Sequence, residues 1–384
     1  YPYEWSFNQF KDSVLLTLKM QLVCIKFGMT LKDATPFNVQ FKNNKPIFID
    51  TLSFEYIDEE NYVWKPYKQF CEMFLGPLCL MSYRDPTLNK LLINYINGVP
   101  LKLINELLPF KSKFNLSIFS HLVLHNLIKE GGAKKIKNKK PLIISKSKHL
   151  NIINQLISFV ENIKLPGFGS EWGEYNEETV IEKKGYVVNK KNTINSFLNS
   201  KKYDLIWDVG SNDGLFSRII AESYCSKDLI SFDIDWRCVN KNYLICKKNN
   251  ITNIFPVVFD LSNPTPSVGW MNRERSSVFE RFGTPDLICC FAIIHHIINV
   301  GIPIEKFMDF LSKSSKDVLI EYVPFSDPKC KIIFESRDEN FQYPSENDFV
   351  KVLEQEFKII KSHKLSETDR ILYLLSKNEK FTQK

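Results

Sequence analysis

The sequence predicts an α/β protein in which a parallel sheet, covered by helices on both faces, follows a mainly helical α+β domain. From Tyr203 onward, apolar runs of strand length alternate with amphipathic segments of helix length, which is typical of a parallel sheet. Before Tyr203 the apolar periodicity is mostly helical, apart from one hairpin. The 384 residues are enough for two domains of roughly 100–200 residues each.

Two breaks in the apolar pattern divide the chain into three expected segments. A lysine-rich run after Gly131-Gly132 ends the first helical stretch, and Pro166-Gly167-Phe168-Gly169 ends a later helix at residues 149–163. We therefore expect a mainly helical domain at 1–130, a basic linker with a connecting helix at 131–165, and the α/β domain at 166–384.

The elements expected within these segments follow from apolar spacing and from the turn residues between apolar runs. In the first domain we expect helices at 6–28, 67–83, 91–108 and 121–128, and a hairpin whose second strand ends at Asp50. In the α/β domain we expect strands at 205–209, 229–233, 254–259, 286–291 and 317–322, helices near 193–199 and at 215–224, 237–248, 303–313 and 346–356, and a final antiparallel pair at 357–363 and 371–376.

Composition narrows the class of protein. The net charge of +7 is carried almost wholly by lysine, which indicates a solvated surface rather than a nucleic-acid groove. The nine cysteines form no C-x-x-C pair, so we expect no disulfide framework and a cytoplasmic location. His121 and His125 have metal-ligand spacing but no third ligand nearby, so no metal is expected. No membrane span or signal peptide is visible, and the chain begins with Tyr1, as a fragment of a longer protein would.

Candidate functional residues gather in the stretch Tyr203–Phe216. Its apolar strand is followed at once by the turn Gly210-Ser211-Asn212-Asp213-Gly214 and then by the start of an amphipathic helix. Glycine in such a turn permits a left-handed backbone and the close approach of a ligand, and the helix start adds free N–H donors. Plain strand-to-helix turns share this pattern, so the turn alone does not establish a binding site.

Three successive strands of the α/β domain end in an aspartate, at Asp208, Asp233 and Asp260. Ligands of open parallel sheets bind at the carboxyl ends of the strands, so these side chains are expected to lie together. Asp233 follows Gly214 by 19 positions, close to the roughly 20-residue offset at which an acidic side chain binds ribose hydroxyls. The alternative is that the three aspartates cap the helices that follow them.

Residues from about 170 to 384 resemble class I S-adenosylmethionine-dependent methyltransferases, through DVGSNDG at 208–214, DID at 233–235, VFD at 258–260 and AIIHHI at 292–297. The resemblance implies a Rossmann-like, seven-stranded methyltransferase sheet with S-adenosyl-L-methionine as cofactor. By carry-over, Gly210 and Gly214 would flank the methionine moiety, Asp233 would hold the ribose and Asp260 the adenine. The cofactor-binding residues that it implies are Asp208, Gly210, Ser211, Asn212, Gly214, Asp233, Asp260 and Phe291.

A nicotinamide dehydrogenase is the competing interpretation of the glycine turn. Its pattern requires G-x-G-x-x-G, whereas Gly210 is followed by Ser211 and Asn212. The acidic pair Asp208 and Asp213 also suits a cofactor with an amino group and a sulfonium better than it suits a pyrophosphate. Both observations favour S-adenosylmethionine.

A narrower resemblance covers nearly the whole chain. The segments DATPFNVQF, PIFIDTLSFE, NPTPSVGWMNRERSSVFER, PDLICCFAIIHHI and VLIEYVPFSDP look like bacterial methyltransferases related to the nodulation protein NoeA. This resemblance implies the class of reaction more than it implies the acceptor.

Candidate catalytic residues are His295, His296 and Glu321, which follow the fourth strand or end the fifth. A methyl acceptor of high pKa needs a base, and these side chains could supply it. We favour His296 over His295, because alternation along a strand sends neighbours to opposite faces. Packing and capping roles are the alternative for both histidines. The loop Gly269–Arg281, which holds three arginines, could cover the acceptor or be an ordinary surface loop.

The first domain resembles the catalytic-loop region of protein and aminoglycoside kinases. Asp33 and Asn38 have the spacing of H-R-D-x-x-x-x-N, and Asp50 falls where D-F-G places its magnesium-binding aspartate. However, Lys32 precedes Asp33, Thr51 follows Asp50, and no glycine-rich loop lies upstream. We therefore expect a kinase-like scaffold without activity.

The sequence as a whole predicts a methyltransferase that acts on an oxygen or nitrogen atom of a small molecule or a glycan. Two alternatives stay open: a bifunctional kinase–methyltransferase, and a non-catalytic adaptor that binds the cofactor or a partner. A nucleic-acid substrate is less favoured, because the basic residues are lysines without clustered arginines and aromatics.

Overall fold

The computed structural model describes residues 1–57, 60–126, 143–165, 184–199, 201–335, 337 and 341–378. The chain divides into two compact units, Tyr1–Tyr175 and Asn176–Lys384. Most of the expected basic linker, residues 131–142, and the expected boundary at 166–169 lie outside the described residues.

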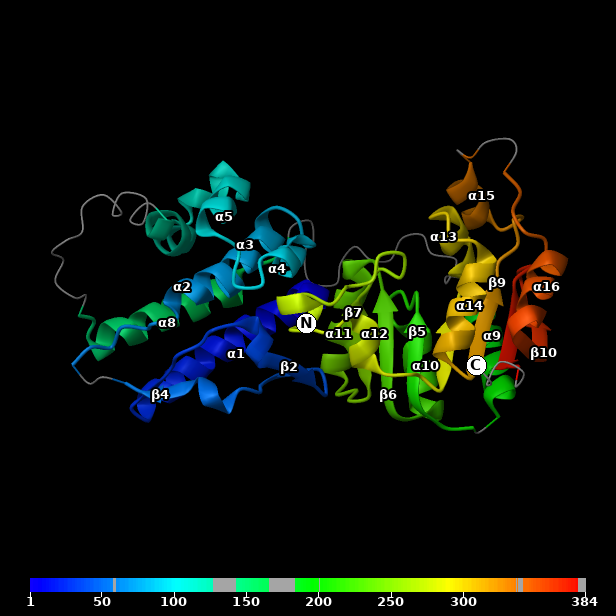
Figure 1. The fold of residues 1–384 in the computed structure, drawn as a ribbon, viewed down its shortest axis with the longest axis horizontal. Coiled ribbons are helices and arrows are strands. Elements are labelled where there is room, and N and C mark those ends of the chain that lie inside the picture. Colours follow the sequence, from blue (N-terminus) through cyan, green and yellow to red (C-terminus); the bar gives the residue numbers. More distant parts are fainter. Residues whose placement is uncertain are drawn as a thin grey trace. The chain divides into compact units, whose positions relative to one another are not determined.

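The first unit is built around α1 (Phe7–Lys26), which Figure 1 draws in blue. The backbone N–H of Ser6 donates to Gln9 Oε1 at 2.8 Å and so satisfies one free donor at the start of the helix. One face of α1 buries Phe10, Val14 and Leu18 in the core of the unit. The helix expected in the connecting segment, α8 (Lys146–Asn162), packs on α1, where Lys11 Nζ donates to the carbonyl oxygen of Glu161 at 2.9 Å.

The expected hairpin is present in the first unit. Strand β2 (Val39–Lys42) pairs antiparallel with β3 (Lys45–Phe48) through Asn43 and Asn44, both with φ of 54°, as a two-residue hairpin turn requires. A second antiparallel pair, which the sequence did not predict, joins β1 (Met29–Leu31) to β4 (Phe54–Tyr56). The shorter helices of the unit are α2 (Tyr67–Phe70), α3 (Gly76–Tyr83), α4 (Leu91–Asn94), α5 (Leu101–Leu107) and α6 (Leu116–Ile118).

The second unit contains the expected seven-stranded sheet, in the order β10-β11-β9-β8-β5-β6-β7. Five neighbouring strands, β7, β6, β5, β8 and β9, run parallel to one another. Strand β11 pairs antiparallel with both β9 and β10, so the predicted terminal antiparallel pair is confirmed. The strands are β5 (Tyr203–Val209), β6 (Cys225–Asp233), β7 (Ile254–Val258), β8 (Leu287–Cys290), β9 (Asp317–Tyr322), β10 (Phe357–Lys364) and β11 (Ile371–Lys377).

Helices cover both faces of this sheet, because successive side chains of each strand point to opposite faces. Trp207 of β5 belongs to a core shared with α14 (Ile304–Ser314) and α16 (Glu346–Glu356). Ile206 belongs to the opposite core, shared with α9 (Lys184–Leu198) and α10 (Leu215–Tyr224). Helix α11 (Trp236–Lys248) contributes Cys246 to the second core, and α12 (Val278–Phe282) contributes Val278 to the first.

Two short helices that the sequence did not predict follow the carboxyl ends of two inner strands of the sheet. Helix α13 (Ile294–Asn299) follows β8, and α15 (Pro328–Phe334) follows β9. A small apolar cluster around Val323, Cys330 and Phe334, with Ile298 packed against it, joins them. They matter for the site because they carry several of its side chains.

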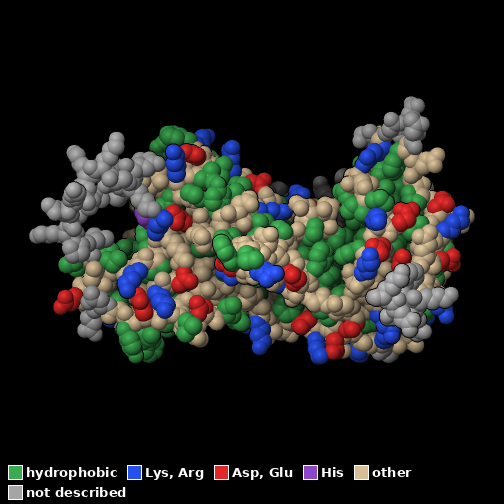
Figure 2. Space-filling model, in the orientation of Figure 1, with side chains coloured by type: hydrophobic (Ala, Val, Ile, Leu, Met, Phe, Trp, Pro, Cys, Tyr) green, Lys and Arg blue, Asp and Glu red, His purple; other side chains and the backbone are tan. Residues whose placement is uncertain are grey.

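The charged surface is mixed. On the face drawn in Figure 2, Lys and Arg side chains are interspersed with Asp and Glu. Within the described ranges, no helix has the length and apolar character that crossing a bilayer requires.

Candidate active site

A cavity of about 460 Å³ opens at the carboxyl ends of the strands of the second unit. This edge is where open α/β sheets bind their ligands, and the volume is that of a small-molecule site. The cavity brings together nearly all of the predicted cofactor residues: Asp208, Gly210, Ser211, Asn212, Asp233, Asp260 and Phe291. Gly214 does not line it and instead ends the turn, just before α10.

The glycine turn owes its shape to two left-handed residues. Gly210 has φ of +76° and Gly214 has φ of +74°. A Cβ at Gly210 would lie 3.0 Å from Ile293 Cδ1, and one at Gly214 would lie 2.3 Å from the side-chain amide of Asn242. Glycine is therefore required at both positions, for backbone conformation and for space. The N–H groups of Gly210 and Ser211 both donate to the carbonyl of Phe232, at 2.9 Å each, which ties the turn to β6.

Asp208 is the most constrained carboxylate of the cavity. It is fully buried, and its Oδ2 accepts a hydrogen bond from Ser217 Oγ at 2.5 Å. Its Oδ1 has no hydrogen-bond partner among the described residues. Burial raises the pKa of Asp208 to about 6, and the Ser217 hydroxyl opposes that shift. A buried carboxylate oxygen without a partner is costly, so a ligand that donates a hydrogen bond there would be favoured.

Asp233, which lines the cavity, is held by backbone donors. The Asn212 N–H donates to its Oδ2 at 2.7 Å and the Asp235 N–H to its Oδ1 at 2.8 Å. Burial raises the pKa of Asp233, and these two donors oppose the shift. Asp260 is fixed by the loop that follows β7, since Ser262 donates both its N–H and its hydroxyl to Asp260 Oδ1, at 2.9 and 2.6 Å.

The capping alternative is wrong for Asp208 and Asp233, whereas Asp260 accepts from the backbone N–H groups of Ser262 and Asn263 and so caps the turn that follows it. The N-cap of α11 is Asp235, whose Oδ1 accepts from the Arg237 N–H at 2.8 Å, and not Asp233. Asp208 bonds the side chain of Ser217 inside α10 rather than a backbone donor at its start. Of the acidic pair expected to face the cofactor, Asp208 and Asp213, the second already forms an ion pair with Lys241 at 2.9 Å.

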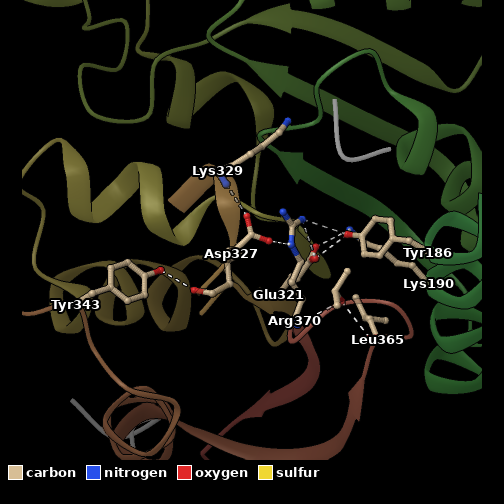
Figure 3. A network of polar contacts seen from close by, with 10 residues as sticks. Tyr186, Lys190, Glu321, Asp327, Lys329, Tyr343, Leu365 and Arg370 are labelled. Carbon is tan, nitrogen blue, oxygen red and sulfur yellow. Dashed lines mark hydrogen bonds and ion pairs between the residues drawn. The ribbon is translucent and has the colours of Figure 1, made fainter. Parts of the chain in front are cut away.

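A buried ion-pair network forms another wall of the cavity (Figure 3). Glu321 of β9 accepts from Lys190 Nζ at 2.6 Å and from the Tyr186 hydroxyl at 2.7 Å. Arg370, just before β11, contacts Glu321 at 3.4 Å and donates to Asp327 at 2.8 Å. The sequence did not point to Tyr186, Lys190, Asp327 or Arg370; the only local signal is the i, i+4 spacing of Tyr186 and Lys190 on α9.

Lys190 combines a carboxylate partner with two aromatic faces. Its side chain is 2% exposed, and its Nζ lies 4.1 Å from the ring centre of Phe216 and 4.2 Å from that of Phe291. Burial lowers the pKa of Lys190, whereas Glu321 raises it. The ammonium is thus held beside Phe291, one of the predicted cofactor residues, by contacts that favour its charged form.

Glu321 does not have the environment of a catalytic base. Burial would raise its pKa, but Lys190 and Arg370 outweigh burial and hold the pKa below its ordinary value. Both carboxylate oxygens have donors, and Glu321 does not line the cavity. This geometry favours a role in holding Lys190 and Arg370 over the proton transfer that we expected.

Both candidate histidines line the cavity, but they lie on helix α13 and not on β8. The argument from strand alternation that favoured His296 is therefore wrong. His295 is 2% exposed, and its Nδ1 has no partner among the described residues. Burial, then the neighbouring His296 and Arg370, lower its pKa to about 3. His296 lines the cavity and is solvent-exposed there. Partial desolvation of its ring, followed by the charge of Lys329, lowers its pKa.

The arginine-rich loop does not cover the site. None of the residues 269–281 lines the cavity, and the Trp270 side chain is 81% exposed. The backbone of Val268 pairs with that of Arg275, which closes the loop on itself.

The kinase-like residues of the first unit do lie together. Asn38 Nδ2 donates to Ser53 Oγ at 2.9 Å and approaches Asp33 Oδ2 at 3.5 Å, and Ser53 Oγ donates to Asp50 Oδ2 at 2.6 Å. These groups satisfy one another, and the described residues contain no cluster of three or more metal-binding side chains. A scaffold without kinase activity stays our prediction for this unit.

Comparison with known proteins identifies a relative along almost the entire chain. The sequence is 30% identical to the nodulation protein NoeA of Rhizobium meliloti (strain 1021) over 389 residues, which cover 99% of this chain and 80% of NoeA. No protein-family model matches the chain.

Solved structures match about half of the chain. The N-methyltransferase NodS from Bradyrhizobium japonicum WM9, in complex with S-adenosyl-L-homocysteine, is 12% identical, with 52% of this chain and 90% of NodS covered and a TM-score of 0.40. The bifunctional kinase-methyltransferase WbdD is 15% identical, with 50% of this chain and 38% of WbdD covered and a TM-score of 0.33. These values are too low to transfer a ligand or an activity.

The network around Glu321 predicts a large loss of stability when one partner is removed. Lys190→Met keeps an apolar stem but leaves Glu321 buried without its closest cation, so the free energy of unfolding is expected to fall by about 3 kcal/mol. Urea unfolding followed by circular dichroism measures the change. Lys191→Met, at the exposed neighbouring position, is the matched control and should stay within about 0.5 kcal/mol of the wild type. Equal stability of the two variants would contradict a buried ion pair between Lys190 and Glu321.

The lowered pKa of His295 predicts a pH-dependent stability. An unfolded histidine titrates near 6.5, whereas folded His295 stays neutral down to about 3, so its contribution is complete above pH 6.5 and is lost as the pH falls toward 3. Between about pH 6.5 and about pH 5.5, the wild type should lose about 1 kcal/mol relative to His295→Gln. Urea unfolding at both pH values tests this, and a constant difference between the two proteins is the contradictory result.

Proposed function

The chain belongs to the family of the nodulation protein NoeA. We propose that its second unit is an S-adenosyl-L-methionine-dependent methyltransferase. The methyl group goes to an oxygen or nitrogen atom of a small molecule or a glycan. The observation that carries the proposal is Asp208 Oδ1, a buried acceptor without a partner among the described residues, in a cavity at the carboxyl edge of the sheet.

The residues of the cavity fit this cofactor in charge and in space. Asp208 offers a buried carboxylate oxygen to a positively charged amino group. Asp233, oriented by two backbone donors, keeps lone pairs for a pair of ribose hydroxyls. Gly210 leaves the backbone open to close approach, and Asp260 borders the cavity where an adenine amino group would donate.

When bound, the cofactor supplies a methyl group activated by a positively charged sulfur. The protein's tasks are then to align the acceptor with that group and to keep water away. Phe216, Phe291 and Ile293 give the cavity apolar walls that exclude water. His296, which faces the cavity and whose pKa is lowered, stays neutral near pH 7 and accepts the proton that the acceptor loses.

We also propose a cytoplasmic location. All nine cysteines are free in the structure, and eight of them are buried, which supports a reducing compartment.

The binding of S-adenosyl-L-homocysteine, measured by isothermal titration calorimetry, tests the cofactor assignment. Asp233→Ala should weaken binding by about tenfold or more, because it removes hydrogen bonds to a charged acceptor. Asp228→Ala is the matched control, since Asp228 is exposed, lies in the first half of the same strand β6 and does not line the cavity. Absence of binding to the wild type, or equal affinities of the two variants, would contradict the proposal.

Methyl transfer separates an enzyme from an adaptor. Incubation with cofactor labelled on its methyl group should transfer label to a component of fractionated cell extract, and His296→Ala should slow that transfer without weakening the binding of S-adenosyl-L-homocysteine. Binding without transfer to any fraction would favour the adaptor.

A further inference from the structure

The cavity of the second unit is divided by charge. Acidic side chains from the ends of β5, β6 and β7 line one part of it, among them Asp208, Asp233 and Asp260. Three cationic side chains line another part, Lys190, Lys329 and Arg370. The acidic part is accounted for by the proposed cofactor, whereas the cationic part has not been given a ligand.

Two of the three cations have buried carboxylates as partners. Lys190 pairs with Glu321 at 2.6 Å. Arg370 pairs with Asp327 at 2.8 Å and lies 3.4 Å from Glu321. Ion pairs therefore account for Lys190 and Arg370, and Lys329 is the third cation of this wall.

Lys329 is the cation of this wall that forms no ion pair among the described residues. Its backbone N–H donates to Asp327 Oδ1 at 3.0 Å, but its side chain extends away from Asp327 (Figure 3). Within the described ranges, no carboxylate lies within 4.0 Å of its ammonium. The side chain is partly buried. Burial, followed by Arg370, lowers its pKa, and Asp327 opposes this shift without forming an ion pair. A partly desolvated ammonium without an ion-pair contact is unfavourable, and an anionic ligand would relieve this cost.

The neighbours of Lys329 place it beside the proposed chemistry rather than beside the glycine turn. Helix α15, which begins at Pro328, packs against α13, which carries His295 and His296. Lys329 is close enough to His296 to lower the pKa of that histidine. The cation that interacts electrostatically with Asp208, next to the glycine turn, is Lys190. Lys329 therefore adjoins the candidate base, where an acceptor would bind.

We propose, on the basis of the proposed function, that the methyl acceptor carries an oxyanion, a carboxylate or a phosphate, which pairs with the ammonium of Lys329. The pair fixes one end of the acceptor, so that its reacting atom lies between His296 and the methyl group. A neutral acceptor would leave the ammonium of Lys329 without an ion-pair partner.

Anion binding to the full chain saturated with S-adenosyl-L-homocysteine tests the inference. Inorganic phosphate and acetate are titrated separately by calorimetry at constant ionic strength, into the wild type, Lys329→Met and Lys331→Met. Lys331 lies on the same helix but is exposed and does not line the cavity, so its variant is the matched control. At least one anion should bind saturably, about tenfold more weakly to Lys329→Met and equally well to Lys331→Met.

The two anions distinguish the sources of the oxyanion. Preference for phosphate indicates a phosphorylated acceptor, and preference for acetate indicates a carboxylate. No saturable binding of either anion, or equal affinity for the wild type and Lys329→Met, overturns the inference while leaving the proposed function intact.

A second pair of ligands separates the acceptor from the cofactor's own carboxylate. S-adenosyl-L-homocysteine contains an amino-acid carboxylate, which 5′-methylthioadenosine lacks. Lys329→Met should bind both as the wild type does. If the variant loses only S-adenosyl-L-homocysteine, Lys329 serves the cofactor and the inference is overturned. If the wild type binds neither compound, the proposed function fails and the inference with it.

Discussion

The wall of the cavity that contains Lys190 and Arg370 depends on the ion pairs and hydrogen bonds of the Glu321 carboxylate. This carboxylate is fully buried and joins α9, through Tyr186 and Lys190, to the turn before β11, through Arg370. Removing a carboxylate and two cations from water is costly, and the cost is offset only while all of the partners are in place. The network therefore fixes Lys190 against Phe216 and Phe291 and gives this wall of the cavity a single arrangement.

Two charged groups that line the cavity, Asp208 and Lys329, carry opposite charges and suit different ligands. Asp208 Oδ1 lies at the end of β5, next to the glycine turn, and suits a cationic amino group. The ammonium of Lys329 lies on α15, beside the histidines of α13, and suits an anion. The same physical cost, a charge removed from water without a partner, thus points to a cofactor in one part of the cavity and to an acceptor in the other.

Local patterns were sufficient to predict the sheet and its acidic edge. Strand β9 and helix α16 begin and end where apolar spacing placed them, and Asp208, Asp233 and Asp260 line one cavity because parallel strands end at one edge. The ion-pair network could not be predicted, since Lys190 and Glu321 are 131 positions apart and only the folded chain joins them. The histidines were expected to follow strand β8, and the preference for His296 rested on strand alternation. That argument failed because the apolar run IIHHI does not separate a buried strand from a short helix.

A crystal structure of the chain with S-adenosyl-L-homocysteine bound tests the central claim most directly. The account predicts the amino group of the ligand near Asp208 Oδ1, the ribose hydroxyls at the carboxylate of Asp233, and the sulfur facing the side of the cavity that carries His296 and Lys329. Electron density for the ligand outside this cavity, or crystals that take up none of it at saturating concentration, would contradict the account.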